Sequence, residues 1–317
     1  MRNPIKLLVF AVMFAGLGGI AHAKQVLRVA HDQWIGYSAF FIADAKGFFA
    51  DEGLEVQASS FSGPGDTIPP LLAGHIDIAL TTLYNLALAQ AKHQGKVSAI
   101  YLLDTSNGAD AVVAAKGIRK PADLKGRSVA VTNGEVNHML LLKALESAGL
   151  SERDIKLVNM NADDAGAALL AGRVDAAVTW EPWVTRAKGS GAEVIYTSAD
   201  APDLILDSVA VREETRKQKS AELTAFLRAI DKGAAYLREH PAESRAIVAR
   251  KLDVSEADVN GMLAGDKIYD VADNKRLLAP GGQGYRSAAE VVKFLRAQGL
   301  ISQPLDENAL MTPALLP

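Results

Sequence analysis

The four residues Trp180-Glu181-Pro182-Trp183 carry the strongest local signal for ligand chemistry in this sequence. Two tryptophans around one glutamate form a flat aromatic wall with a negative charge beside it, although a single Trp there could equally belong to a core. Such a wall is suited to a cationic or planar nitrogen-bearing ligand. Because Pro182 restricts Glu181 to an extended backbone, we expect this strand end to be stiff and to display Trp180 and Glu181.

A second aromatic pair, Trp34 and Tyr37, follows the predicted strand 26–31. A large aromatic side chain at a strand-to-helix turn can belong to the core. Here the pair flanks Gly36 and lies close to Asp32, and this combination favours a cleft.

Polar residues at other strand ends and turns complete the candidate site. Ser62 and Gly63 open a glycine loop whose backbone N–H groups could bind a ligand, and a plain turn explains them about as well. His138 is more typical of a helix face, but one turn after Glu135 it could still face a cleft. The ligand-binding residues predicted from the sequence are Trp34, Tyr37, Ser62, Gly63, Thr81, Thr82, Asn107, Asp110, Asn133, Glu135, His138, Trp180, Glu181 and Asp207.

The charged residues around this candidate site are all acidic. Its loops contain Asp32, Asp110, Glu135, Glu181 and Asp207, and no Arg or Lys. An acid at Glu135, at a helix start, occupies the positive dipole end that could otherwise bind an anion. We therefore expect a ligand with an ammonium, an amidine or an N–H-rich ring, such as an aminopyrimidine or another small amine.

Enzyme signatures are missing from the sequence. It has no HExxH, no GxSxG and no P-loop motif, and no nucleophile–base pair can be identified from spacing. The chain has no cysteine, which excludes disulfides and thiolate metal sites. We predict no catalytic residue, no metal and no cofactor.

A duplicated segment should position these residues. Leu-Leu-Ala-Gly-x-x-Asp-x-Ala-x-Thr begins at Leu71 and again, 98 positions later and without a gap, at Leu169. Each copy reads as a helix end, a glycine stop at Gly74 or Gly172, and a buried strand. The unit is common when it occurs alone, but its repetition indicates two similar α/β halves. Ligands bind beyond the carboxyl ends of such strands, so the divergent tails after each copy should face one cleft.

The remaining pattern alternates strands and helices in both halves and ends in helices. Strands are predicted at 26–31, 54–58, 76–80, 97–103, 111–115, 128–132, 155–159, 174–178 and 204–211. Helices are predicted at 38–49, from 66 or 67 into the first repeat, through His138 to Ala148, from about 163 into the second repeat, and at 222–239, 242–251, 255–263 and 287–298.

The first residues read as an export signal. Arg2 and Lys6 precede the apolar run 7–20, and Ala21-His22-Ala23 is a cleavage motif, so we expect residues 1–23 to be removed. The remainder suits two lobes, and 49% hydrophobic residues can fill two cores. A net charge of −3 gives no basic footprint for nucleic acid. Without a lipid-bearing Cys, the exported chain is expected in a periplasm.

Over nearly its whole mature length the chain resembles the solute-binding proteins of ABC importers of the nitrate/sulfonate/taurine type, which share their fold with thiamine-pyrimidine-precursor binding proteins. The matching segments are Trp34-Ile35-Gly36-Tyr37, Ala43-x-x-Lys46-Gly47-Phe48-Phe49, Gly53-Leu54-Glu55-Val56, both repeats, Pro121-Ala122-Asp123-Leu124-Lys125-Gly126 and Trp180-Glu181-Pro182-Trp183.

The resemblance implies an α/β, two-lobed periplasmic-binding-protein type II fold with two mainly parallel sheets joined by two crossing strands. Lobe I would comprise 24–107 and 208–317, and lobe II 108–207. It further implies a monomer that closes on a small-molecule ligand and delivers it to an ABC importer permease in the inner membrane. Taurine or an alkanesulfonate remains an alternative ligand, but a sulfonate would need backbone N–H donors alone.

Two further readings stay open. Pyrimidine synthases that resemble this family are enzymes on the same fold, but they depend on a lysine-bound cofactor and a cysteine-rich motif that this chain does not match. A binding protein that feeds a sensor would use the same cleft.

Overall fold

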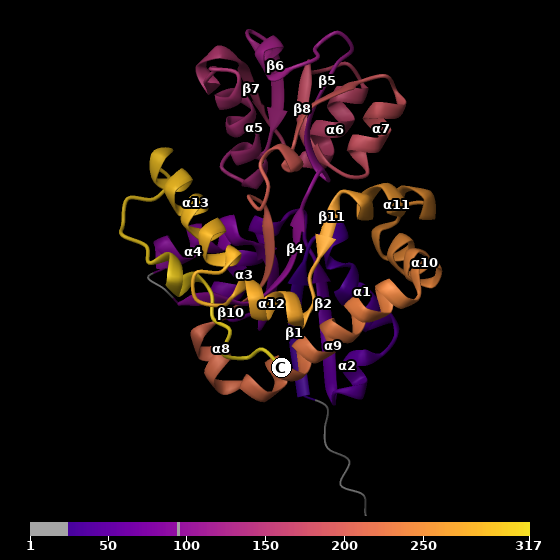
Figure 1. The fold of residues 1–317 in the computed structure, drawn as a ribbon, viewed down its shortest axis with the longest axis vertical. Coiled ribbons are helices and arrows are strands. Elements are labelled where there is room, and N and C mark those ends of the chain that lie inside the picture. Colours follow the sequence, from indigo (N-terminus) through magenta and orange to yellow (C-terminus); the bar gives the residue numbers. More distant parts are fainter. Residues whose placement is uncertain (1–24, 94–95) are drawn as a thin grey trace, which may run out of the picture.

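The computed structural model describes residues 25–93 and 96–317, so the expected signal peptide and its cleavage site lie outside the described residues. Two sheets organise these residues. The six-stranded sheet has the order β11-β4-β10-β3-β1-β2, and the five-stranded sheet has the order β7-β6-β8-β5-β9. We call the parts built on them lobe I and lobe II. They are the lower and upper parts of the molecule in Figure 1.

The two sheets share a plan. In lobe I, β2-β1-β3 are parallel and β10 is antiparallel to β3. In lobe II, β7-β6-β8 are parallel and β5 is antiparallel to β8. Antiparallel strands complete both sheets, which are therefore mixed. The sequence repeat runs into β3 in one lobe and into β8 in the other, as the duplication indicates.

Lobe I begins with alternating strands and helices: β1 Gln25–His31, α1 Ser38–Ala45, α2 Phe48–Asp51, β2 Leu54–Ser60, α3 Ile68–Leu72, β3 Ile78–Thr82, α4 Leu83–His93 and β4 Val97–Ser106. The helix expected over 38–49 is split in two, because Gly47 adopts a left-handed φ of 76° between α1 and α2. Helix α4 is buried along most of its length and packs between β4 and the C-terminal helix α13.

Lobe II comprises β5 Asp110–Ala114, β6 Ser128–Val131, α5 Val136–Ser147, β7 Lys156–Asn159, α6 Ala162–Leu170, β8 Ala176–Trp180, α7 Trp183–Gly189 and β9 Glu193–Thr197. Its core consists mainly of Val and Ala on the strands, packed against α5, α6 and α7. Strand β9 is not foreseen by the sequence pattern. It pairs with β5 at the edge of the sheet.

The chain crosses between the lobes twice. It leaves lobe I after β4 and enters lobe II at β5, through residues 107–109. It returns through 198–205 into β10 Leu206–Arg212, which lies between β3 and β4. Strand β11 Asp266–Ile268 runs beside the first crossing, where the Gly265 carbonyl accepts from the backbone N–H groups of Asn107 and Ala109.

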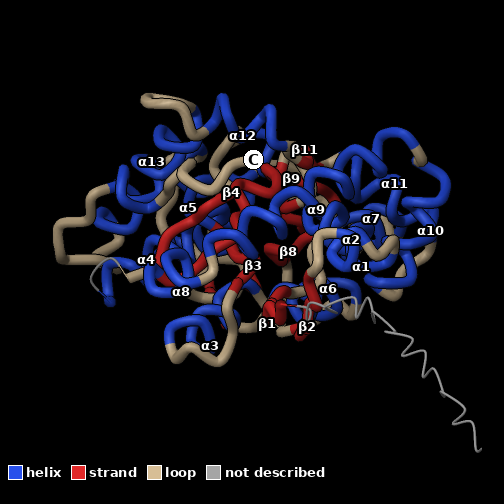
Figure 2. Tube along the Cα trace, turned by 90° about the horizontal axis from the view of Figure 1, so that it is seen from below, coloured by secondary structure: helices blue, strands red, loops and turns tan. Residues whose placement is uncertain are grey.

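The remaining helices return to lobe I: α8 Glu213–Gln218, α9 Ser220–Glu239, α10 Pro241–Leu252, α11 Glu256–Ala264, α12 Val271–Leu277 and α13 Gln283–Ala297. Helix α9 packs along α1, where Gly233 lies so close to the Ala39 carbonyl that no Cβ would fit. Seen from below, helices flank both sides of the strands (Figure 2).

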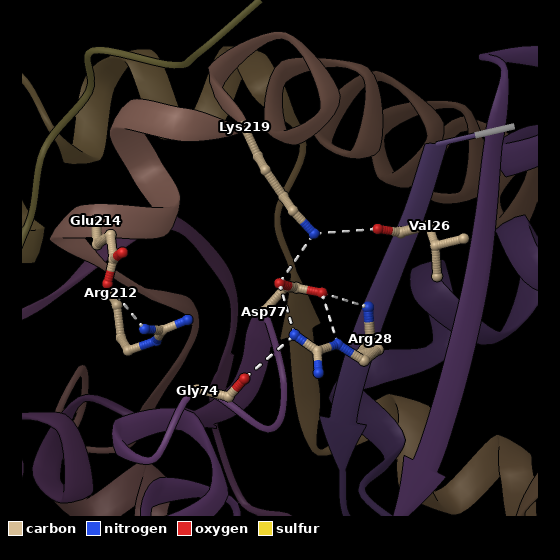
Figure 3. Close-up of polar contacts among 7 residues, drawn as sticks. All are labelled: Val26, Arg28, Gly74, Asp77, Arg212, Glu214 and Lys219. Carbon is tan, nitrogen blue, oxygen red and sulfur yellow. Dashed lines mark hydrogen bonds and ion pairs between the residues drawn. The ribbon is translucent and has the colours of Figure 1, made fainter. Parts of the chain in front are cut away.

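The repeated Asp is a framework residue. Asp77 is buried behind the carboxyl end of α3 and accepts from the backbone N–H of Arg28 at 2.9 Å and from Lys219 Nζ at 3.0 Å (Figure 3). Figure 3 also shows the Arg28 guanidinium contacting both Asp77 and the Gly74 carbonyl. Asp77 therefore joins β1, the repeat turn and the start of α9.

Candidate functional site

The ends of both repeats meet between the lobes. Thr82 ends β3 opposite Asp207 of β10, and Trp180 ends β8 opposite Asp110 of β5. These four residues line one small hollow of about 20 Å³, together with Asp32, Trp34, Pro64, Val136 and Ile205. The sequence assigns Trp34, Thr82, Asp110, Trp180 and Asp207 to one cleft, and here they surround the same space. We call this space the floor hollow.

A second hollow of about 80 Å³ adjoins it. Ser62, Gly63 and Glu135 from the predicted set line this side hollow, and its other walls are Pro64, Gly65, Asp66, Thr132, Asn137, Asn161, Ala162 and Trp180. Trp180 and Pro64 are common to both hollows. The side hollow therefore continues the floor hollow around the Trp180 ring.

Trp180 also borders the mouth of the cleft, a recess of about 430 Å³ lined by residues of both lobes. Its indole Nε1 donates to Asp163 Oδ1 at 3.1 Å, which holds the ring across the gap. On the other side the ring centroid lies 6.3 Å from that of Trp34, at an interplanar angle of 63°. An edge-to-face aromatic pair thus spans the lobes above the floor hollow.

Three buried carboxyl groups line the floor hollow: Asp32, Asp110 and Asp207. Two more lie on the neighbouring strands, Asp104 opposite Asp207 in β4 and Asp266 opposite Ser106 in β11. Burial raises the pKa of Asp110 to about 7 and that of Asp207 to about 6. Burial, with the charges of neighbouring carboxylates, also raises the pKa values of Asp32, Asp104 and Asp266 well above their usual range. No Lys, Arg or His is among the described residues that line the two hollows.

Several oxygens of these carboxyl groups have no hydrogen-bond partner: one each on Asp32, Asp104 and Asp110, and both on Asp266. A buried carboxylate without a partner is strongly disfavoured, so a cation or an N–H donor that entered the site would stabilise its ionised form. The walls of the floor hollow therefore include a carboxyl oxygen, on Asp110, that has no hydrogen-bond partner.

Tyr37 and Trp34 support this acidic group from behind. The Tyr37 hydroxyl donates to Asp207 Oδ1 at 2.8 Å, and Trp34 Nε1 donates to Asp104 Oδ1 at 3.2 Å. Tyr37 is fully buried and does not line either hollow. Gly36 lies against Asp104, where a Cβ would come within 2.2 Å of its carboxyl carbon. The glycine therefore leaves room for a carboxylate under the aromatic pair.

Asp104 and Asp266 were not among the residues predicted from the sequence. Asp104 lies inside a long apolar strand, directly opposite Asp207 in the β4–β10 pairing. Asp266 arrives from the C-terminal part of the chain and pairs with Ser106. The only sequence signal is that Asp104 interrupts a hydrophobic run, and no pattern in the sequence connects Asp266 to the cleft.

Glu181 does not have the displayed position that the sequence suggests. Its carboxylate is buried and turned toward α7, where it accepts from the Thr185 backbone N–H at 3.0 Å and from the Thr185 hydroxyl at 2.9 Å. It satisfies an otherwise unpaired N–H group in the first turn of the helix. Glu181 thus supports the strand end that carries Trp180, and it lines neither hollow nor the mouth.

Four other predicted residues also lie off the cleft walls. The Thr81 hydroxyl donates to the Pro64 carbonyl, and His138 contacts Glu152 at 2.9 Å through Nε2. The side chains of Asn107 and Asn133 are exposed and line neither hollow nor the mouth. Thr81 fixes the proline loop that forms the shared wall of the two hollows.

The described residues contain neither a cluster of metal ligands nor a membrane-spanning helix. Within 25–93 and 96–317, no group of three or more His, Cys, Asp or Glu side chains is arranged to hold a metal ion. None of the helices in these ranges is long and apolar enough to cross a membrane.

Two α/β lobes joined by two crossings, with a site between them, define the periplasmic-binding-protein fold. The solved periplasmic aliphatic sulphonate binding protein of Escherichia coli superimposes with a TM-score of 0.75 at 20% identity, covering 89% of this chain and 96% of that one. A desulfurization enzyme also has this fold, with a TM-score of 0.68 at 18% identity, covering 92% and 97% of the two chains.

The NMT1/THI5-like family model matches residues 34–244, and the chain belongs to that family. Curated relatives cover most of both chains. A protein of Haemophilus influenzae described as a putative thiamine biosynthesis protein is 29% identical (89% of this chain, 90% of the relative). The taurine-binding periplasmic protein of Escherichia coli is 27% identical (91% and 92%). The formylaminopyrimidine-binding protein of Halalkalibacterium halodurans is 26% identical (85% and 83%).

Proposed function

We propose that this protein is the periplasmic solute-binding component of an ABC importer and captures a small organic cation, an amine or an aminopyrimidine, between its lobes. The membership of the family and the fold support the class. The nature of the ligand rests on one observation: Asp110 is 2% exposed, faces the floor hollow and has an oxygen without a partner, in walls that contain no basic side chain among the described residues.

The binding event follows from the placement of the residues. A ligand first enters lobe I against Thr82 and Asp207, and lobe II then brings Asp110 and Trp180 over it. The ammonium or ring nitrogen takes the unpartnered carboxylate oxygens, while the Trp180 face covers the ligand and excludes water. Closure by hinge motion at the two crossings would present the loaded form to a permease. We propose that the protein is a monomer. Its lobes divide near residues 107 and 207.

A sulfonate ligand is the second candidate, because relatives that bind taurine and aliphatic sulfonates match as well as the pyrimidine-binding one. Against it stands the charge of the cleft. A sulfonate group in these hollows would lie beside Asp110, Asp207 or Glu135 with no cationic partner in the walls. An enzyme is the third candidate. Against it, no hydroxyl among the described residues that line the two hollows is hydrogen-bonded to a general base: that of Thr82 contacts Asn85 and that of Thr132 contacts the Met160 carbonyl.

Isothermal titration calorimetry with aminopyrimidines, small amines, taurine, alkanesulfonates and nitrate tests the proposal. The expected result is saturable binding of an amine or aminopyrimidine that Asp110→Asn weakens by about tenfold or more, since a charge-assisted hydrogen bond is lost. Tight binding of nitrate or of an alkanesulfonate without an amino group would refute it. Recovery of the ligand chemically unchanged separates a binding protein from an enzyme.

A further inference from the structure

The two hollows have buried polar atoms without hydrogen-bond partners, and these atoms differ in kind. The floor hollow has acceptors, among them Asp110 Oδ2, whereas the side hollow has an N–H donor, Asn137 Nδ2. Asp110 and Asn137 are each 2% exposed. A buried polar group without a partner is costly, so a ligand that supplies the partner is stabilised at that place. The two hollows therefore fit opposite groups of one ligand.

Other polar side chains of the side hollow are already bonded within the protein. The Thr132 hydroxyl donates to the Met160 carbonyl at 3.2 Å. The Asn161 side chain caps α6, where it accepts from the Asp164 backbone N–H and donates to the Asp164 carboxylate, both at 2.8 Å. Among the described residues that line this hollow, Asn137 alone has a buried side-chain atom without a partner. Its amide N–H is therefore the group left for a ligand.

Asn137 lies in the first turn of α5, where the two hollows adjoin. Val136 lines the floor hollow and Asn137 lines the side hollow, so consecutive residues connect the two. Glu135 is the N-cap residue of this 12-residue helix, but it makes no capping hydrogen bond, because its carboxylate accepts from Asn85 Nδ2 at 2.5 Å. The positive end of the helix dipole thus lies at the side hollow, where it favours an acceptor on the ligand.

The charges of the side hollow restrict the kind of acceptor. Glu135 lines the same hollow, and no Lys, Arg or His is among its described walls. A carboxylate or sulfonate group beside Glu135 would add a second negative charge without a cationic partner. A carbonyl oxygen or a ring nitrogen accepts from Asn137 without this repulsion. The side hollow therefore suits an uncharged acceptor.

Resting on the proposed function, we infer that the ligand carries an uncharged hydrogen-bond acceptor besides its basic nitrogen, and that Asn137 is the residue that selects it. The basic nitrogen lies in the floor hollow against Asp110, the middle lies along Trp180, and the acceptor takes the Asn137 Nδ2 hydrogen. The hollows of about 20 and about 80 Å³ hold roughly seven water-sized groups at about 10 to 15 Å³ each. A four-carbon amino amide has this size.

Calorimetric titration of the purified protein with 4-aminobutanamide, 4-aminobutanoate and pentylamine tests this inference. We expect the amino amide to bind about tenfold more tightly than pentylamine, because only the amide gives the Asn137 donor a partner. The aminobutanoate should bind no more tightly than pentylamine. Asn137→Leu should weaken the amino amide by about tenfold and change pentylamine by less than about twofold. Asp110→Asn should weaken both.

Asn260→Leu is the matched control, because Asn260 is exposed on α11 and lines neither hollow. It should leave all affinities unchanged. Thermal midpoints should show that Asn137→Leu is folded, and Asn137→Ala replaces it if it is not.

Three results would overturn the inference: equal affinities for the amino amide and pentylamine, an equal loss of both in Asn137→Leu, or tightest binding of the aminobutanoate. If pentylamine still requires Asp110 in those cases, the proposed function stands. If none of the three amines binds and ethanesulfonate does, the proposed function fails as well.

Discussion

The two lobes use the same repeated unit for the same structural task. Asp77 in lobe I and Asp175 in lobe II each accept the backbone N–H at the neighbouring strand, from Arg28 at 2.9 Å and from Ser128 at 2.8 Å. The repeated threonines behave alike as well. Thr81 donates to the carbonyl of Pro64 at 2.8 Å, and Thr179 donates to that of Ala162 at 2.7 Å. The shared residues of the motif therefore build the framework of each lobe.

The lobes differ at the residue that follows the repeated threonine. Lobe I has Thr82, a small residue whose hydroxyl bonds to Asn85, and lobe II has Trp180, which reaches across the gap. The antiparallel strand opposite carries an aspartate in both lobes, Asp207 and Asp110. The two lobes therefore carry an aspartate at equivalent positions, while a single aromatic side chain makes the cleft asymmetric.

The framework aspartates differ in their surroundings, and the largest predicted effect follows from this difference. The Asp77 side chain is 3% exposed and neutralised by Arg28 and Lys219, whose hydrogen bonds outweigh burial and lower its pKa. The Asp175 side chain is 37% exposed. Asp77→Asn should lower the free energy of unfolding by about 3 kcal/mol, because two partly buried cations lose their counter-charge.

Asp175→Asn should cost only about 1 kcal/mol, since water can replace its contacts. Urea denaturation followed by circular dichroism measures both losses. Equal losses would contradict the assignment of different roles to the two copies.

The aromatic asymmetry gives the next prediction. Trp180→Ala should weaken ligand binding by tenfold or more, on the scale of about 1.4 kcal/mol per decade, because the shared wall of both hollows is lost. Trp180→Phe keeps a ring and should recover part of the affinity. Calorimetry with the tightest ligand gives both values, with thermal midpoints to show that the variants are folded. Unchanged affinity in Trp180→Ala would remove the site from this cleft.

The equivalent aspartates predict a pH dependence. In the folded protein the pKa values of about 7 for Asp110 and about 6 for Asp207 lie above the ordinary value of 3.8. These raised pKa values add to the free energy of unfolding. The contribution is fully present below pH 3.8 and is lost as the pH rises through 6 to 7. A bound cation favours the ionised forms, so its affinity should rise over the same range, by up to about tenfold per pH unit for each proton released.

Other groups also titrate, so the measurement compares the wild type with Asp110→Asn. Thermal midpoints and titration calorimetry between pH 5 and 8 should show a smaller pH dependence of affinity in the variant. A cation affinity that falls as the pH rises would contradict the account.

The smallest predicted effect concerns closure. A Cβ on Gly65 would meet Glu135 Oε1 at 2.2 Å across the gap, whereas a Cβ on Gly189, at the exposed end of α7, would meet nothing within 4 Å. Gly65→Ala should weaken binding several-fold, by about 1 kcal/mol, because the side chain resists full closure. Gly189 lines neither hollow, so Gly189→Ala is the control and should leave affinity unchanged. If both variants bind like the wild type, lobe closure at this contact does not limit affinity.

The sequence predicted the fold and much of the floor hollow for a physical reason. Periodicity and the repeat locate the parallel strands, and the residues after their carboxyl ends must meet at one edge. Strand β11 and the acids Asp104 and Asp266 escaped prediction, because their position depends on strand register and on a long-range return of the chain.

Glu181 shows the opposite limit. Its place beside Trp180 suggested a ligand contact, but a carboxylate at that point can also satisfy the first turn of the following helix. The distance of four residues to Thr185 was the available signal for this capping contact.

The most direct test of the central claim is mass spectrometry of the small molecules released when the purified protein is denatured. The account predicts a compound with basic nitrogen, present in proportion to the protein and lost from the Asp110→Asn, Asp207→Asn double variant. Recovery of a sulfonate or another anion without basic nitrogen would contradict a cleft built for positive charge.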